Sequence, residues 1–136
     1  MRWHPNGVRY GQLEAMEASM NKDDILKMEA GREMDELILV HIFGYQKLPL
    51  PADPEYQKPT EDGVLCAYHI NRYSTDIKAA WEVANNKLFK HFQIDRVDDR
   101  IDKWHVTLAT NTRVSSEFAD TPELAICRAA LLAVME

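Results

Sequence analysis

The sequence predicts an α+β fold, arranged as an α-β-α layered sandwich in which helices pack on a small antiparallel sheet. Two observations support this class. Apolar residues recur at helical spacing in three segments, which begin near Asn21, Ser74 and Thr121. Between the second and third segments, apolar and polar residues alternate as they do in strands. Helices and short strands that follow one another in this order favour an α+β architecture.

The length of 136 residues fits one domain that can bury a core without disulfides. We expect residues 1–19 to form an N-terminal extension, disordered or weakly helical, and residues 20–136 to form the single domain. The net charge of −6 argues against binding of long nucleic acid, which needs a basic face. Two cysteines and the lack of a long apolar run predict a reducing compartment and no membrane span.

The first helical segment is predicted to begin after Asn21, whose side chain can cap the helix while Asp24 reaches back to it. Gly31 interrupts the apolar spacing and predicts a bend or a break into two helices. Gly44 is a natural stop. The apolar stripe of this segment comprises Ile25, Met28, Met34, Leu37, Ile38 and Ile42.

Residues 47–63 are rich in proline, and we interpret them as a long loop that ends in a turn. A short strand is predicted over 64–70. The second helix is predicted over 75–90, capped by Ser74 or Thr75. Its apolar stripe, which we expect to face the core, consists of Ile77, Trp81, Ala84 and Leu88.

Strands are predicted over 92–97 and 103–110, with a third over 113–118. In the second of these strands His105 and Thr107 project to one face. They are either buried beneath helices or line an open groove, and the sequence leaves both alternatives open. The residues on the opposite face, which we expect to be buried, are Trp104, Val106 and Leu108.

The last helix has the clearest start in the chain. Thr121 can cap it, Pro122 suits its first turn, and the charge of Glu123 suits the positive end of the helix dipole. Its apolar stripe consists of Leu124, Cys127, Leu131 and Val134.

Three segments, residues 25–35, 73–83 and 121–131, together resemble the phage ABA-sandwich domain family, small proteins encoded in phages and prophages of Gram-positive bacteria. The resemblance implies an α-β-α layered arrangement and a phage-encoded protein that acts in the cytoplasm of the infected host. It implies no particular activity, because the family has no settled biochemical role.

The helix starts at Ser74 and Thr121 are the candidate anion sites, since unpaired backbone N–H groups and the helix dipole favour a phosphate there. Tyr73 could stack on a base or ribose, and arginine side chains could pair with a phosphate. Plain helix capping explains the same residues. The candidate ligand-binding residues are Tyr73, Ser74, Thr75, Arg113, Thr121 and Arg128.

Two functions remain open. The first is a non-enzymatic phage accessory protein that binds or sequesters a small phosphorylated, nucleotide-type signal of host defence, by analogy with other small phage proteins. The alternative is a protein-interaction module that masks a host protein or assembles as an oligomer. We expect a homo-oligomer in either case.

No side chain with catalytic or metal-binding spacing is evident. Cys66 and His69 could supply half of a zinc site, but no second pair supports one, so we interpret Cys66 as a buried strand residue. Cys127 lies on an apolar stripe, where a thiol is inert. The four aspartates between 95 and 102 alternate with basic residues, which predicts a solvated turn with local ion pairs. We therefore expect no enzyme, no cofactor and no metal.

Overall fold

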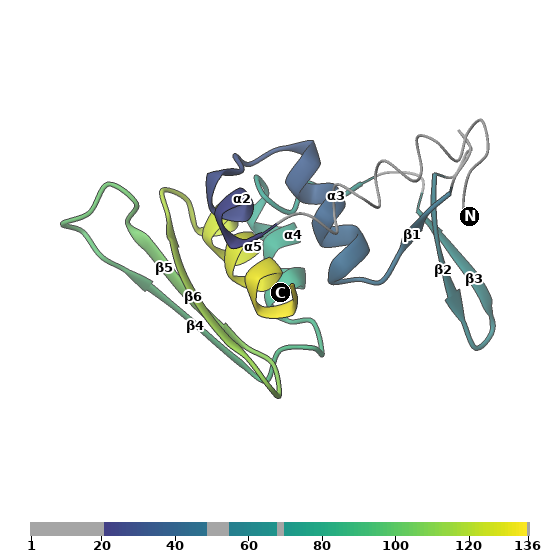
Figure 1. Ribbon diagram of the computed structural model, residues 1–136. Coiled ribbons are helices and arrows are strands. Elements are labelled where there is room, and N and C mark those ends of the chain that lie inside the picture. The colour runs from purple at the N-terminus through teal and green to yellow at the C-terminus, as the bar shows by residue number, and fades with distance from the viewer. Residues whose placement is uncertain (1–20, 49–54, 68–69, 136) are drawn as a thin grey trace.

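The computed structural model describes residues 21–48, 55–67 and 70–135, and the predicted extension over 1–19 lies outside them. Within these ranges the chain forms helices and two three-stranded antiparallel sheets, so the α+β class is confirmed (Figure 1). The helices are α2 (Lys22–Lys27), α3 (Arg32–His41), α4 (Ile77–Ala84) and α5 (Pro122–Val134). The first sheet contains β1 (Gln46–Lys47), β2 (Tyr56–Thr60) and β3 (Gly63–Ala67), and the second β4 (His91–Arg96), β5 (Trp104–Ala109) and β6 (Val114–Ala119).

Helix α5 lies at the centre of the core. It packs on β5 and β6 on one side and on α2, α3 and α4 on the other (Figure 1). Small residues on α5 let these strands and helices approach closely, and the surrounding elements leave almost no part of α5 exposed. The fully buried residues of α5 are Ala125, Ile126, Cys127, Ala129, Ala130 and Leu131.

The boundaries of α2 and α3 follow the local signals in the sequence. Asn21 and Asp24 form the predicted capping box, with the Asp24 N–H donating to Asn21 Oδ1 at 3.1 Å. The predicted break near Gly31 is confirmed, because α2 ends at Lys27 and α3 starts at Arg32. Gly44 has a φ of +79°, which glycine adopts without strain, and it follows the end of α3.

The prediction for α4 is wrong in its start, its end and most of its buried face, of which only Ala84 is buried. Asp76, not Ser74 or Thr75, caps the helix, and the helix ends at Ala84. Ile77 and Trp81 are about 40% exposed. Apolar residues occur at helical spacing on two faces of α4. The face with the smaller residues packs on α5, because small side chains allow the two helices to approach more closely. The buried residues of α4 are Ala79, Ala80, Val83 and Ala84.

The interpretation of 47–63 as one long loop is also wrong, although the turn predicted at its end is confirmed. The segment contains β2, which forms a hairpin with β3 around a turn at Glu61 and Asp62. Pro59 is tolerated in β2 because β1 pairs only with the residues at the start of this strand, so Pro59 interrupts no ladder on that side. Residues 49–54 of the predicted loop lie outside the described residues.

The sheet β4–β5–β6 matches the predicted strands to within one or two residues. The described helices lie on one face of this sheet, where Val106 and Leu108 are buried (Figure 1). His105 and Thr107 project to the other face, and 27% of the His105 side chain is exposed. Of the two alternatives for this face, the structure therefore supports the open one within the described residues.

Candidate functional site

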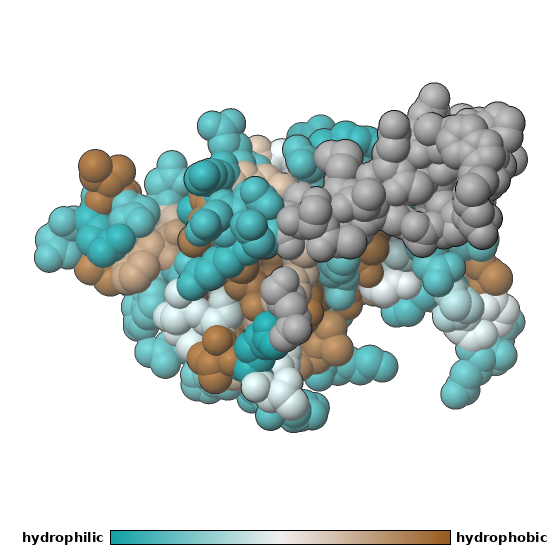
Figure 2. Space-filling view, viewed as in Figure 1, coloured by the Kyte–Doolittle hydropathy of each residue, from teal (hydrophilic) through white to brown (hydrophobic). Residues whose placement is uncertain are grey.

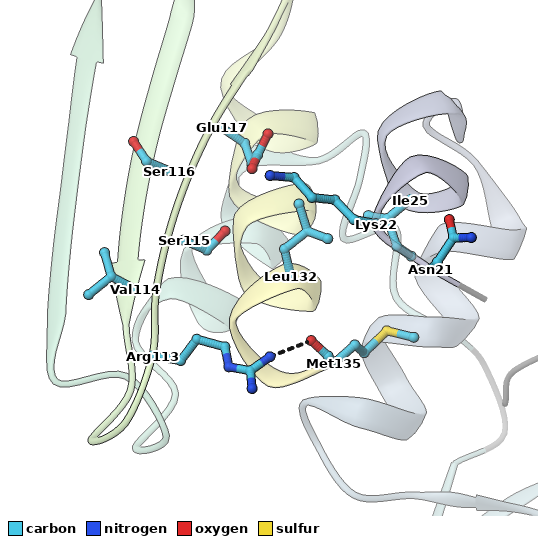
Figure 3. A pocket seen from close by; sticks show the side chains of 10 residues that line it. All are labelled: Asn21, Lys22, Ile25, Arg113, Val114, Ser115, Ser116, Glu117, Leu132 and Met135. Carbon is cyan, nitrogen blue, oxygen red and sulfur yellow. Dashed lines mark hydrogen bonds between the residues drawn. The ribbon is translucent and has the colours of Figure 1, made fainter. Parts of the chain in front are cut away.

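A cavity of about 300 Å³ lies between β6, the C-terminal end of α5 and the first turn of α2 (Figure 3). We call it the β6–α5 pocket. Strand, helix end and helix start each contribute side chains, so the pocket depends on segments far apart in the sequence. The residues that line it are Asn21, Lys22, Ile25, Arg113, Val114, Ser115, Ser116, Glu117, Leu132 and Met135.

Ser115 is the most informative residue of the pocket. It lies on the face of β6 that packs against α5 and is only 7% exposed. Its Oγ is buried and has no hydrogen-bond partner among the residues that the structure describes. Buried hydroxyl groups are nearly always paired, because an unpaired one costs about 1–3 kcal/mol. A polar ligand atom in the pocket would supply the missing partner.

The charges around Ser115 are mixed. Arg113 Nη1 donates to the Met135 carbonyl at 3.1 Å, which holds the guanidinium beside the end of α5. Figure 3 shows Lys22 extending toward Glu117. Burial raises the pKa of the Glu117 carboxyl, while the positive charge of Lys22 acts to lower it. Two cations and one carboxyl group suit a ligand that carries an anionic group together with hydroxyl donors.

The structure removes the start of α4 from the candidate site. The Ser74 N–H and Oγ–H donate to Asp35 Oδ1 at 2.8 and 2.7 Å, and Ser74 Oγ accepts from the Gly31 N–H at 2.9 Å. The Asp35 carboxylate thus occupies the position at Ser74 that the sequence assigned to a phosphate. Thr75 is exposed and its N–H donates to the Arg72 carbonyl at 3.1 Å.

Tyr73 is not available to stack on a base. It is 3% exposed, and its ring stacks on Phe43 with 5.2 Å between the ring centroids. Burial raises the pKa of its phenol to about 12. Tyr73 is therefore a packed core residue.

Thr121 and Arg128 lie together, but away from the β6–α5 pocket. Thr121 Oγ1 accepts from the Leu124 N–H at 3.2 Å and so acts as a helix cap. Arg128 donates to the Phe118 carbonyl at 3.2 Å and to the Met28 carbonyl at 3.4 Å, which ties α5 to β6 and to the end of α2. The open cavity beside them is also lined by three acidic residues, which disfavour a phosphate: Glu29, Asp102 and Asp120. Of the six predicted site residues, the pocket therefore contains only Arg113.

The open face of the sheet carries a cluster that the sequence analysis missed. His105 Nε2 is hydrogen-bonded to Ser116 Oγ, and His105 Nδ1 lies 4.0 Å from Asp95 Oδ2. Thus Ser116 lies beside a histidine, an arrangement that no spacing in the sequence indicated. The alternation in each strand indicates which side chains share a face. Only the register of the three strands shows that Asp95, His105 and Ser116 lie close together on that face.

The structure tests three further predictions, which concern the two cysteines and the aspartates between β4 and β5. Cys66 is exposed on β3, so its predicted burial is wrong, and His69 lies outside the described residues. Cys127 is buried as predicted, and burial raises the pKa of its thiol. Local ion pairs form in the β4–β5 turn as predicted, with Arg96–Asp98 at 2.8 Å and Arg100–Asp102 at 2.9 Å.

The described residues contain no group of three or more histidine, cysteine, aspartate or glutamate side chains placed to hold a metal ion. No helix within them has the length and apolar character needed to cross a membrane.

Comparisons with known proteins agree with the fold. The chain is similar to a phage protein from Bacillus cereus ATCC 14579, whose 2.0 Å crystal structure superposes with a TM-score of 0.59. The two share 29% sequence identity over 79% of this chain and 93% of that chain. No protein of curated function matches. Residues 36–131 match the model of the phage ABA sandwich domain. Because this match covers more than half of the sequence, the chain belongs to the phage ABA sandwich domain family.

Proposed function

We propose that this phage protein is an accessory protein of the infected cell's cytoplasm that binds a small phosphorylated, nucleotide-type ligand in the β6–α5 pocket and holds it without turnover. The observation that supports the proposal is the buried Ser115 hydroxyl, which has no partner among the described residues and borders the cavity. Arg113 and Lys22 supply positive charge at the same cavity.

The size of the pocket limits which part of a ligand it encloses. About 300 Å³ is at the lower end of the range for small-molecule sites. It suits one phosphate and the adjoining sugar, with the phosphate beside Arg113 and Lys22. A carboxyl group such as that of Glu117 commonly accepts hydrogen bonds from ribose hydroxyls. Ile25, Leu132 and Met135 add apolar walls against which a ring can pack.

Calorimetry with the purified full-length chain tests this proposal. ADP-ribose, a cyclic dinucleotide and inorganic phosphate are titrated separately, and chromatography checks that the ligand is recovered unchanged. We expect stoichiometric binding of at least one nucleotide, and at least tenfold weaker binding by Ser115→Ala. Thr112→Ala is the control, because Thr112 is exposed in the turn before β6 and does not line the pocket. Absence of heat with all three ligands, or equal affinity in Ser115→Ala, would overturn the proposal.

A second proposed function, association with another copy of this chain, is favoured by a separate observation. Ile77 and Trp81 lie one turn apart on α4 and are 40% and 41% exposed, and Leu88 beyond the helix is 40% exposed. The Trp81 ring meets Phe92 edge-on with 5.3 Å between the centroids, so the apolar surface continues onto β4. Figure 2 shows that hydrophilic residues cover much of the described surface on the face it presents.

Light scattering coupled to size-exclusion chromatography tests this second proposal. We expect the wild-type chain to have at least twice the monomer mass and Trp81→Lys to have the monomer mass. Lys78→Glu on the same helix is a control for changes of charge alone. A monomeric wild-type chain would refute self-association, and a stoichiometric host protein retained by the wild type would indicate masking of that protein instead.

A further inference from the structure

The outward face of the sheet β4–β5–β6 carries a nucleophile, a base and an acidic group from three adjacent strands. Asp95 comes from β4, His105 from β5 and Ser116 from β6. Asp95 is directly opposite His105 in the register, and Ser116 is opposite Thr107, two residues along from His105. All three side chains project away from α5, since the neighbours of His105 and Ser116 in sequence, Val106 and Ser115, are buried on the helix side.

The contacts give each group a definite role. The hydrogen bond between Ser116 Oγ and His105 Nε2 lets the hydroxyl donate to an unprotonated ring nitrogen. The other ring nitrogen then carries its proton toward Asp95, whose Oδ2 lies 4.0 Å away. That distance exceeds a hydrogen bond, but such contacts in catalytic sites often shorten when substrate binds. The arrangement has the order acid, imidazole and hydroxyl that activates serine nucleophiles.

Neighbouring side chains hold these groups in place. The His105 ring stacks on Phe118 with 4.4 Å between centroids, and Gln93 Nε2 donates to Asp95 Oδ2 at 3.0 Å. Thr107 Oγ1 lies 3.0 Å from Ser116 Oγ and can donate to it, which leaves the serine proton for His105. Phe118 therefore positions the imidazole of His105, and Gln93 positions the carboxylate of Asp95.

Backbone donors are available beside Ser116. Strand β6 forms the edge of its sheet within the described residues, and the Thr110 N–H donates to the Arg113 carbonyl. Because narrow and wide pairs alternate along an antiparallel ladder, the N–H groups of Ser116 and Phe118 point away from β5, toward the uncovered edge. Unpaired amides next to a nucleophile are the donors that stabilise an oxyanion.

We propose that Ser116 is the nucleophile of an acyl-transfer site, with His105 as general base and Asp95 as its positioning residue, that hydrolyses small carboxylic esters with a short apolar acyl group. Val114 lies on the same face as Ser116 and is 69% exposed, so an acyl chain can contact it. The ring of Phe118 is stacked against His105 and has the Arg100 guanidinium 3.9 Å from its centroid. This activity is separate from ligand binding in the β6–α5 pocket, which lies on the other side of β6.

The reaction balances with water as the only co-reactant. Ser116 Oγ attacks the ester carbonyl carbon while its proton moves to His105 Nε2, and the carbonyl oxygen becomes an oxyanion. The carbon–oxygen bond to the alcohol then breaks, and His105 returns the proton to the departing alkoxide. Water then attacks the acyl carbon while its proton moves to His105 Nε2. The bond between that carbon and Ser116 Oγ breaks and His105 returns the proton to Oγ, which restores Ser116 and releases the carboxylic acid.

An alkyl fluorophosphonate probe tests the proposal on the full-length chain, with intact mass and peptide mapping as readouts. We expect one adduct, on Ser116, that Ser116→Ala abolishes and that His105→Gln slows about 100-fold, the lower end for general-base catalysis. Thr112→Ala, at an exposed position in the turn between β5 and β6, is the control and should label at the wild-type rate. Asp95→Asn should slow labelling while Asp95→Glu restores it, which distinguishes positioning by a carboxylate from a merely structural contact.

Hydrolysis of p-nitrophenyl acetate provides a second readout, and circular dichroism confirms that each variant is folded. We expect ester turnover that is lost in Ser116→Ala and kept in Thr112→Ala. An unlabelled wild-type chain, an adduct on another residue, or equal rates in the wild type and His105→Gln would overturn the proposal. None of these results depends on whether the β6–α5 pocket binds a nucleotide.

Discussion

Replacement of Ser74 by alanine should destabilise the fold strongly, although serine to alanine is a small change. The Ser74 hydroxyl donates to Asp35 Oδ1 at 2.7 Å and accepts from the Gly31 N–H at 2.9 Å. Ser74 and Asp35 are 1% and 5% exposed, so water cannot replace either contact without opening the core. Hydrogen bonds to charged groups contribute about 1.5–3 kcal/mol each and neutral ones about 1 kcal/mol. We therefore expect a loss of about 2–4 kcal/mol.

Urea unfolding followed by circular dichroism measures this loss. With a typical slope of about 2 kcal/mol per molar urea, the midpoint should fall by about 1–2 M while the slope stays unchanged. Thr75→Ala is the control, because this adjacent residue is exposed and should shift stability by less than about 0.5 kcal/mol. Equal midpoints for Ser74→Ala and Thr75→Ala would refute the buried link between α3 and the start of α4, and would reopen Ser74 as a ligand site.

Three further outcomes follow from the contacts. Arg128→Ala should lower the free energy of unfolding by about 1.5–3 kcal/mol, because Arg128 bridges two carbonyls, and an unchanged melting temperature would contradict this role. A thiol reagent at pH 8 should modify only Cys66 in the native chain, because Cys127 is buried and burial raises the pKa of its thiol. Cys66→Ser should therefore abolish the modification, and two fast-reacting thiols in the wild type would show that α5 is exposed. Tyr73 should make the fold less stable between about pH 10 and pH 12, because its phenol stays protonated in the folded chain while the unfolded chain loses that proton. Tyr73→Phe should weaken this pH dependence in urea unfolding, and an identical pH profile in the variant would argue against the raised pKa.

The predictions from sequence succeeded where the determining contacts are local. The capping box at Asn21 and the cap at Thr121 each join residues three apart, so the sequence displays both partners. The strands β4, β5 and β6 alternate regularly and were located to within one or two residues. The break at Gly31 was visible for the same reason.

The errors arose where a distant residue decides the outcome. Ser74 has the properties of a helix cap, but Asp35, 39 residues away, binds it, and Asp76 caps α4 instead. The stripe at Ile77 and Trp81 has core spacing, yet the alanines on the other face let α5 approach more closely. Pro59 suggested a loop, although the short β1 leaves room for a proline in β2.

Neither candidate site could be predicted from spacing alone. The β6–α5 pocket joins the start of α2 to β6 and the end of α5, and its main feature, an unpartnered hydroxyl, exists only after these elements have packed. The cluster on the open face depends on the register of three strands, since a shift by one residue would turn Ser116 inward and Ser115 outward. Alternation within a strand places adjacent side chains on opposite faces, but it does not decide whether Ser115 or Ser116 faces the core.

The most direct test of ligand binding in the β6–α5 pocket is an NMR titration of the ¹⁵N-labelled chain with the nucleotide that gives the strongest calorimetric signal. We expect the largest amide shifts at residues 113–117 and at Asn21 and Lys22, with little change around Ser74 and Thr121. Shifts concentrated at Ser74 or Thr121, with residues 113–117 unmoved, would contradict the assignment of the ligand to this pocket.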